Sequence, residues 1–143
     1  MTKIALGTDH AGFRLKEEIK SHLILKGYEV VDFGTDSEAA VDYPDFCRPA
    51  AQSVARKECD LGIVFGGSGN GEAMAANKVS GVRCGLCWNV ESARLTKEHN
   101  NANVIALGGR MVTAAEGVAI VDAWLDAEFQ GGRHQQRIDK LEK

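Results

Sequence analysis

An apolar, strand-like segment over residues 61–65 runs directly into a loop rich in glycine, and this junction constrains the fold more than any other part of the chain. Four glycines stand within residues 66–71, and Glu72 follows them. Glycine at this density costs conformational entropy on folding, and it is useful where the chain takes positive φ or where a ligand approaches the main chain closely. The helix expected over 72–78 would point its positive end at the same loop. The order of strand, loop and helix predicts an anion-binding turn, with a tight turn that binds nothing as the alternative.

The loop lacks the G-x-G-x-x-G pattern that marks dinucleotide-binding folds. Its glycines at 67, 69 and 71 alternate, and the sixth position is Glu72. A carboxylate at this position would repel a pyrophosphate group. The arrangement instead favours a site at which main-chain N–H groups stabilise a transient oxyanion while Glu72 transfers a proton.

Five apolar segments of strand length alternate with segments of helical periodicity. The strands are expected at 3–8, 28–33, 61–65, 82–88 and 103–107, and the later helices at 90–99, about 113–126 and 133–142. One boundary stays open, because the helix before the third strand could begin near Pro44 or near Pro49. This alternation specifies parallel βαβ units and predicts a single α/β domain over 1–143. We expect a doubly wound sheet of five parallel strands, with helices on both faces and a C-terminal helix.

Ligands bind doubly wound sheets at the carboxyl ends of the strands. Asp9 and His10 follow the first strand, Glu72 ends the loop after the third, and Arg110 follows the fifth. We therefore expect these side chains to share one edge of the sheet. Taken alone, Asp9 and His10 could equally be turn or cap residues.

Composition argues against several classes of function. The chain has 143 residues, of which 44% are hydrophobic and 26% charged, and this is enough to bury the core of one domain without disulfides or metal. A net charge of −3 gives no electrostatic footprint for nucleic acid or for an acidic membrane. With no leader-like or long apolar segment in view, a cytoplasmic location is expected.

Cys84 and Cys87 match the C-x-x-C spacing of a redox pair or of half a zinc site. They lie within the strand expected over 82–88, where residues three apart point to opposite faces of a sheet. No second C-x-x-C and no His pair at ligand spacing accompanies them. Buried, reduced thiols are therefore expected here and at Cys47 and Cys59, and no metal site is predicted.

Two groups in the second half of the chain have both structural and functional interpretations. His99 and Asn100 fall at the end of a predicted helix, where ordinary capping would explain both. Arg133 and Arg137 are four residues apart on one helical face, with His134 beside them. Charged runs on a terminal helix are usually solvated, but few acidic residues on this face could pair with these arginines, which leaves them free for a phosphate.

Together, these residues supply a carboxylate base, main-chain donors, imidazoles and three arginines. That is the set of groups needed to remove a proton next to a carbonyl in a phosphorylated substrate. Nothing in the set requires a metal or a cofactor.

Six motifs, spread over nearly the whole chain, carry a resemblance to a known family. They are Gly-Thr-Asp-His-Ala-Gly at 7–12, Asp-Tyr-Pro at 42–44, Gly-Gly-Ser-Gly-Asn-Gly-Glu at 66–72, Ala-Ala-Asn-Lys at 75–78, Glu-His-Asn-Asn at 98–101 and Gly-Gly-Arg-His-Gln-Gln-Arg at 131–137. On these motifs the chain resembles ribose-5-phosphate isomerase type B, of the family that also contains galactose-6-phosphate and allose-6-phosphate isomerases.

The resemblance implies a Rossmann-like homodimer with active sites at the subunit interface, and a tetramer is an alternative. It implies a cofactor-free enzyme of carbohydrate metabolism that interconverts an aldose phosphate and a ketose phosphate through a cis-enediolate. D-ribose 5-phosphate and D-ribulose 5-phosphate, of the pentose phosphate pathway, are the expected pair. Allose 6-phosphate, galactose 6-phosphate and four-carbon phosphates stay open as alternatives, because pocket depth depends on packing.

The same resemblance implies a role for each site residue. Asp9 and His99 would help to open the sugar ring, and Tyr43 and Asn100 would bind hydroxyl groups. The enediolate oxygens would be held by Ser68 and by the loop amides at Gly67, Gly69, Asn70 and Gly71. The phosphate would be bound by a set drawn partly from the partner chain: His10, Arg110, Arg133, His134 and Arg137.

One position departs from many members of the family. Those members carry a cysteine base at the position that is Gly66 here. The branch without this cysteine resembles one that uses a glutamate at the end of the loop, so the base is assigned to Glu72 and none of the four cysteines is catalytic. A carboxylate at a helix N-terminus tends to a low pKa, and burial therefore has to raise the pKa of Glu72 toward working pH.

Two other classes of function are alternatives. A small nucleotide-binding or regulatory module could use the same loop to hold a phosphate, and it would bind adenine nucleotides in place of sugar phosphates. A purely structural interaction protein is the weaker alternative, because it leaves the anion-binding groups without a purpose.

Overall fold

The computed structural model describes the whole chain, residues 1–143, as five parallel strands in one sheet of order β2-β1-β3-β5-β4. The strands are β1 (Lys3–Thr8), β2 (Glu29–Asp32), β3 (Leu61–Gly66), β4 (Cys84–Leu86) and β5 (Val104–Gly108). The helices are α1 (Phe13–Leu25), α2 (Tyr43–Ala55), α3 (Asn70–Asn77), α4 (Val90–Glu98), α5 (Ala114–Asp126) and α6 (Arg133–Leu141). The predicted α/β fold with its doubly wound sheet and C-terminal helix is confirmed.

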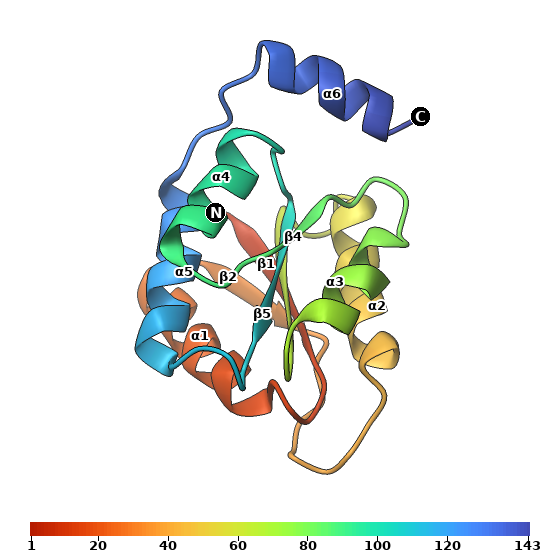
Figure 1. Ribbon diagram of the computed structural model, residues 1–143. Helices are drawn as coiled ribbons and strands as arrows, with labels where there is room; N and C mark the ends of the chain where they lie inside the picture. The colour runs from red at the N-terminus through yellow and green to blue at the C-terminus, as the bar shows by residue number, and fades with distance from the viewer.

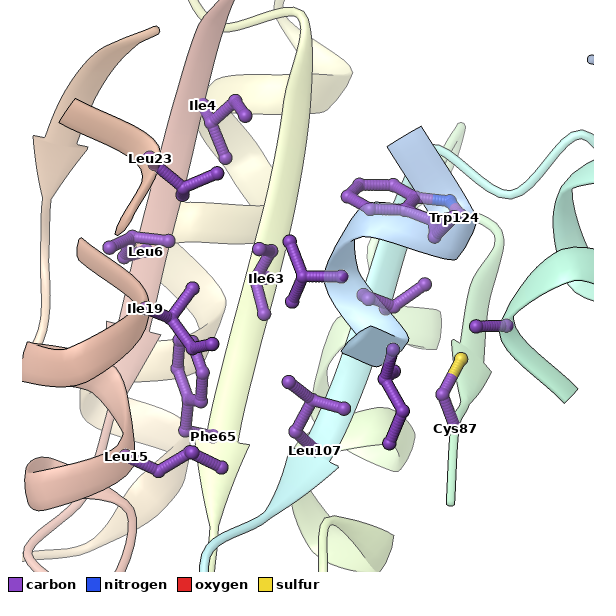
Figure 2. Close-up of a cluster of buried hydrophobic side chains, with 14 residues drawn as sticks. Ile4, Leu6, Leu15, Ile19, Leu23, Ile63, Phe65, Cys87, Leu107 and Trp124 are labelled. Atoms are coloured by element: carbon purple, nitrogen blue, oxygen red, sulfur yellow. The ribbon is translucent and has the colours of Figure 1, made fainter. Parts of the chain in front are cut away.

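Helices cover both faces of the sheet, and α6 stands apart from the layers (Figure 1). On the face covered by α1, α4 and α5, large apolar side chains such as Phe65 and Trp124 fill the core (Figure 2). On the other face, α2 and α3 contribute mainly small residues, including Ala50 and Ala76. Small side chains allow these two helices to pack close to the sheet.

The direction of the chain across the sheet decides which face each helix covers. From β1 the chain moves outward to β2 through α1, and it then returns past β1 to β3 through α2. Because crossovers between parallel strands are right-handed, α1 and α2 lie on opposite faces. The loops after β1 and β3 therefore diverge, and they leave a crevice at the carboxyl ends of the strands. The predicted site residues Asp9, His10 and Glu72 come from these two connections.

The helix α2 begins at Tyr43 and continues through Pro49. Of the two starts that the sequence allowed, the one near Pro44 is therefore correct. Pro44 lies in the first turn, where a missing N–H breaks no intrahelical bond. Pro49 removes one bond from the interior, to the carbonyl group of Asp45. Since Asp45 is exposed, water can satisfy that carbonyl group and the helix continues.

The helix α3 begins two residues earlier than predicted, because Glu72 closes its first turn. Gly69 is the N-cap, and its φ of +89° costs glycine nothing. The N–H of Gly69 donates to Oε1 of Glu72 at 3.1 Å. Asn70 and Gly71 therefore belong to the first turn of the helix, and Glu72 stands at its third position rather than at its start.

Candidate active site

The carboxylate of Glu72 lies inside the protein, directly against the main chain at the end of β3. Only 4% of the residue is exposed. A Cβ placed on Gly66 would lie 1.9 Å from Oε1 and 2.0 Å from Cδ of Glu72. The carboxylate therefore fills the space that any side chain at position 66 would occupy.

The surroundings of Glu72 raise its pKa above the ordinary carboxyl value. Burial is the largest cause, and the negative charge of Asp9 adds to it. The N–H groups of Gly69 and of Glu72 itself act in the opposite direction, because they stabilise the ionised form. The expectation that burial raises the pKa of this carboxyl is confirmed, and the shift favours its use as a general base.

Asp9 is held rigidly at the other side of the crevice. It is 7% exposed, and its Oδ1 accepts the N–H groups of Ala11 at 2.9 Å and Gly12 at 3.1 Å. These two donors precede α1, so the carboxylate fixes the turn between β1 and that helix. Asp9 is thus both a turn-forming residue and a neighbour of Glu72, and the two interpretations of its sequence position are compatible.

Tyr43 and Ser68 flank the first turn of α3. A Cβ on Gly71 would lie 2.5 Å from Cζ and 2.8 Å from Oη of Tyr43, so the phenol ring lies directly over that glycine. Ser68 is exposed, and its Oγ accepts the N–H of Asn70 at 3.2 Å. The structure therefore brings Tyr43, Ser68 and the loop residues together at the carboxyl end of β3, as the motifs imply.

His10 and Arg110 line one cavity of about 320 Å³ beside the glycine loop. Nδ1 of His10 accepts the N–H of Val41 at 3.2 Å, which leaves Nε2 to donate to a ligand when the ring is neutral. The guanidinium group of Arg110 reaches back over the loop, with Nη1 3.1 Å from where a Cβ on Gly67 would stand. Arg14 also lines this cavity, and the sequence analysis missed it. The sequence feature that could have identified Arg14 is its position four residues after His10, in the first turn of α1.

A second cluster lies around α6. The rings of His99 and His134 stack with their centroids 4.4 Å apart and an interplanar angle of 11°. Together with Asn100, Arg137 and two apolar residues of α6 they line a cavity of about 420 Å³. Burial lowers the pKa of His134, and the charges of His99, Arg133 and Arg137 lower it further. A neutral His134 can donate or accept a hydrogen bond in this cationic setting.

The two clusters lie at opposite ends of the sheet. The chain leaves the carboxyl end of β4, runs back along α4 and reaches His99 at the amino end of β5. In Figure 1 the strands end at the bottom, whereas α6 lies across the top. Within one chain, Glu72 is thus separated from five of the predicted site residues: His99, Asn100, Arg133, His134 and Arg137.

The cysteines fit the expectation of reduced thiols with one difference. All four are free, and Cys47, Cys59 and Cys87 are buried, but Cys84 is only half-buried because β4 is an edge strand. Cys84 packs on the α2 and α3 side of the sheet and Cys87 on the other side, as their spacing predicts. Burial raises the pKa of Cys87 to about 12 and raises the pKa of Cys47 and Cys84. These thiols are poor nucleophiles and poor bases at neutral pH.

No group of three or more His, Cys, Asp and Glu side chains is arranged to hold a metal ion. None of the helices has the length and apolar character needed to cross a bilayer.

Comparisons with known proteins identify the family of the chain. A sequence model of the family described as Ribose/Galactose Isomerase matches residues 4–141. The chain therefore belongs to the ribose/galactose isomerase family. This outcome confirms the resemblance that the six motifs carry.

Relatives that bear the name ribose-5-phosphate isomerase B are similar over most of their length. The Escherichia coli protein is 48% identical over 141 residues, covering 99% of this chain and 95% of the relative. The Mycolicibacterium paratuberculosis protein is 52% identical over 141 residues, covering 97% of this chain and 89% of the relative.

Solved structures agree with these sequence relatives. Ribose-5-phosphate isomerase B of Clostridium thermocellum superposes with a TM-score of 0.97 at 51% identity, covering 99% of this chain and 95% of that one. The Mycoplasma genitalium enzyme with bound ribulose-5-phosphate superposes with a TM-score of 0.95 at 45% identity, covering 99% and 94% of the two chains.

Proposed function

We propose that this chain interconverts D-ribose 5-phosphate and D-ribulose 5-phosphate, with Glu72 as the base. The observation that supports this proposal most directly is the buried carboxylate of Glu72, whose pKa is raised and which accepts the N–H of Gly69 in the glycine loop at the carboxyl end of β3. The names of the relatives at about 50% identity support this choice of substrates, as does the ribulose-5-phosphate complex of the Mycoplasma genitalium enzyme.

The reaction moves one proton between two neighbouring carbons. After ring opening, assisted by Asp9 and His99, Glu72 removes the proton from C2 of the aldose and a cis-enediolate forms. Ser68 and the loop amides of Gly67, Gly69, Asn70 and Gly71 hold its oxygens. The oxygen on C1 gains a proton, the hydroxyl on C2 loses one, and Glu72 returns its proton to C1 to give the ketose. Main-chain donors suit the developing negative charge, because the fold holds them in place before the step.

The separation of the two clusters supports a homodimer with shared sites. A two-fold axis that crosses the strand direction would place the carboxyl end of one sheet beside the amino end of its partner. His99, Asn100 and the α6 residues of one chain would then complete the site around Glu72 of the other. Tyr43 and Asn100 would bind hydroxyl groups. The phosphate would meet His10 and Arg110 from one chain, and Arg133, His134 and Arg137 from its partner.

The edge of the sheet at β4 offers a surface for such a partner. Met74 is 64% and Trp88 65% exposed, and Val90 beside them is 48% exposed. Met74 and Leu86 also line a groove of about 570 Å³ between α3 and β4. An exposed apolar patch on an edge strand is typical of an interaction surface. The homodimer, the alternative tetramer and the cytoplasmic location stay predictions.

A panel of aldose phosphates tests the proposal. We expect formation of ribulose 5-phosphate from ribose 5-phosphate in the presence of a chelator, and slower conversion of allose 6-phosphate, galactose 6-phosphate and four-carbon phosphates. Faster conversion of another sugar phosphate would move the assignment to that substrate. Loss of turnover with the chelator would contradict the metal-free mechanism. Heat of binding with adenine nucleotides and none with sugar phosphates would favour a nucleotide-binding module instead.

A further inference from the structure

Arg83, in the segment before β4, lies where the C-terminal ends of α4 and α6 meet. Its Nε donates to the carbonyl group of Asn100 at 3.0 Å, and its Nη2 donates to that of Asn101 at 2.9 Å. Its Nη1 pairs with Oε1 of Glu142 at 2.6 Å. Only 18% of the arginine side chain is exposed. All three nitrogen atoms of the guanidinium group are therefore engaged, each with a different residue.

The acceptors of Arg83 belong to two helix ends that need a positive charge. Asn100 and Asn101 follow His99, the C-cap residue of α4, at the end of the helix where the dipole is negative. Glu142 is the C-cap of α6, and a carboxylate at that end of a helix is unfavourable unless a cation offsets it. The planar guanidinium fork spreads its donors over three nitrogen atoms and so can reach three separate acceptors, whereas the three donors of a lysine ammonium share a single nitrogen atom.

The same two helix ends carry the second cluster of site residues. His99 and Asn100 stand in the turn whose carbonyl groups Arg83 binds, and His134 and Arg137 stand on α6. Asn101 has a φ of +45°, a left-handed conformation that asparagine adopts more readily than most residues but less readily than glycine, and its carbonyl group accepts a hydrogen bond from Nη2 of Arg83. At one end α6 contacts the turn through the His99–His134 stack, and at the other end through Glu142 and Arg83.

We propose that Arg83 is a positioning residue that fixes the turn at Asn100 and the helix α6 relative to one another, and so preorganises the phosphate-binding half of the site. This inference rests on the proposed function of that half-site. Arg83 itself does not touch the cavity between His99 and Arg137. It acts through the residues that line the cavity, because an arginine or imidazole that is not held in place binds phosphate more weakly.

The test compares Arg83→Lys, Glu142→Gln and a matched control, Arg94→Lys. Arg94 also forms ion pairs, with Glu91 and Glu98, but all of them lie within α4. Affinity for inorganic phosphate is measured by calorimetry, and KM and kcat are measured with ribose 5-phosphate. For Arg83→Lys we expect KM and the phosphate Kd to rise together by roughly tenfold, with kcat changed by less than about threefold. For Glu142→Gln we expect a smaller rise in both constants, and for Arg94→Lys no rise.

A second substitution provides a rescue. If Arg83 acts by holding the turn, Asn101→Gly in the Arg83→Lys background should recover part of the lost phosphate affinity, because glycine takes a positive φ without cost. Unchanged phosphate Kd and KM in folded Arg83→Lys would overturn the inference, and so would an equal effect of Arg94→Lys. A wild-type protein that binds phosphate but does not convert ribose 5-phosphate would contradict the proposed function, while the calorimetry would still decide the role of Arg83.

Discussion

The carboxylate of Glu72 and a side chain on residue 66 would occupy the same space, because a Cβ on Gly66 would lie 1.9 Å from Oε1 and 2.4 Å from Oε2. Atoms that are not bonded cannot approach so closely, so the two arrangements exclude each other. Residue 66 therefore decides where the carboxylate of Glu72 can lie, although it contributes no functional group of its own. Glycine at this position is what leaves room for Glu72.

We predict that Gly66→Ala displaces the carboxylate and lowers kcat by roughly 100-fold, with little change in KM for ribose 5-phosphate. The three atoms nearest to the added methyl group all belong to Glu72, and none belongs to a group proposed to bind the phosphate. Gly62→Ala is the matched control on the same strand, since a Cβ there would lie 3.1 Å from Cγ2 of Val54, a side chain that can shift. Steady-state kinetics of the two variants measure kcat and KM. A wild-type kcat in Gly66→Ala would show that the carboxylate acts from another position.

The pH dependence of turnover should report the interaction between Asp9 and Glu72. A general base works when ionised, so kcat/KM falls as the pH drops through the pKa of Glu72. Burial first, and the charge of Asp9 second, raise that pKa, and they move the acid limb of the profile above the ordinary carboxyl range. Asp9→Asn keeps the acceptor for Ala11 and Gly12 but removes the charge, and we expect it to move the acid limb to lower pH.

The measurement uses D-ribulose 5-phosphate, because this ketose has no ring to open and the effect of Asp9 on ring opening is avoided at the start of the reaction. Asp45→Asn, at an exposed position of α2, is the control. An acid limb that stays in place or rises in Asp9→Asn would contradict the electrostatic coupling.

The buried carboxyl group of Glu72 should also lower the free energy of unfolding at neutral pH. A carboxyl whose pKa is higher in the folded state than in the unfolded state keeps its proton longer when folded, so its contribution is most favourable at low pH and is lost as the pH rises through the folded pKa. We expect Glu72→Gln to raise the free energy of unfolding by about 1 kcal/mol at pH 7. The gain should shrink toward zero as the pH falls below the unfolded carboxyl pKa.

Denaturant unfolding at several pH values measures this difference, with Glu58→Gln at an exposed position as the control. Destabilisation by Glu72→Gln at neutral pH would mean that the ionised carboxylate is better satisfied in the folded protein than its raised pKa indicates.

The C-terminal end of α2 lies outside the proposed site, and it tests how a residue in the left-handed conformation affects stability. Lys57 follows α2 with a φ of +63°, and the N–H of Glu58 bonds to the carbonyl group of Ser53 at 2.9 Å, as in a Schellman motif. Glycine fits the left-handed position better than lysine, so Lys57→Gly should raise the free energy of unfolding by about 1 kcal/mol and leave kcat unchanged. Lys57→Ala, which keeps a Cβ, should show no such gain in thermal or denaturant unfolding.

Local signals in the sequence predicted most of the fold. The apolar segments predicted five parallel strands, and short-range chemistry fixes the helix ends: Thr113 and Glu116 form a capping box, and Asn89 accepts the N–H of Ser92 as an N-cap. The boundaries that differed have local causes as well. Glu72 extends α3 backward by bonding to Gly69, and the exposed carbonyl group of Asp45 tolerates Pro49 within α2.

The contacts that the sequence did not predict depend on how distant segments of the chain are placed in the fold. Asp9 and Glu72 lie on adjacent strand ends, and the rules for doubly wound sheets were enough to bring them together. His99 and His134 meet only because α4 returns to the amino end of the sheet and α6 crosses it, which no local pattern specifies. Arg83 was missed for the same reason, since an arginine in a sequence gives no indication of which distant carbonyl group it will face. Arg14 did carry a local signal, its place four residues after His10.

Conversion and binding of ribose 5-phosphate by Glu72→Gln test the central claim most directly, because this substitution keeps the shape of the side chain and removes its basicity. The account predicts a fall in turnover of roughly 1,000-fold, while the Kd for ribose 5-phosphate from calorimetry stays within about threefold of the wild-type value. Retention of most of the turnover, or an equal loss of binding and turnover, would contradict the assignment of the base.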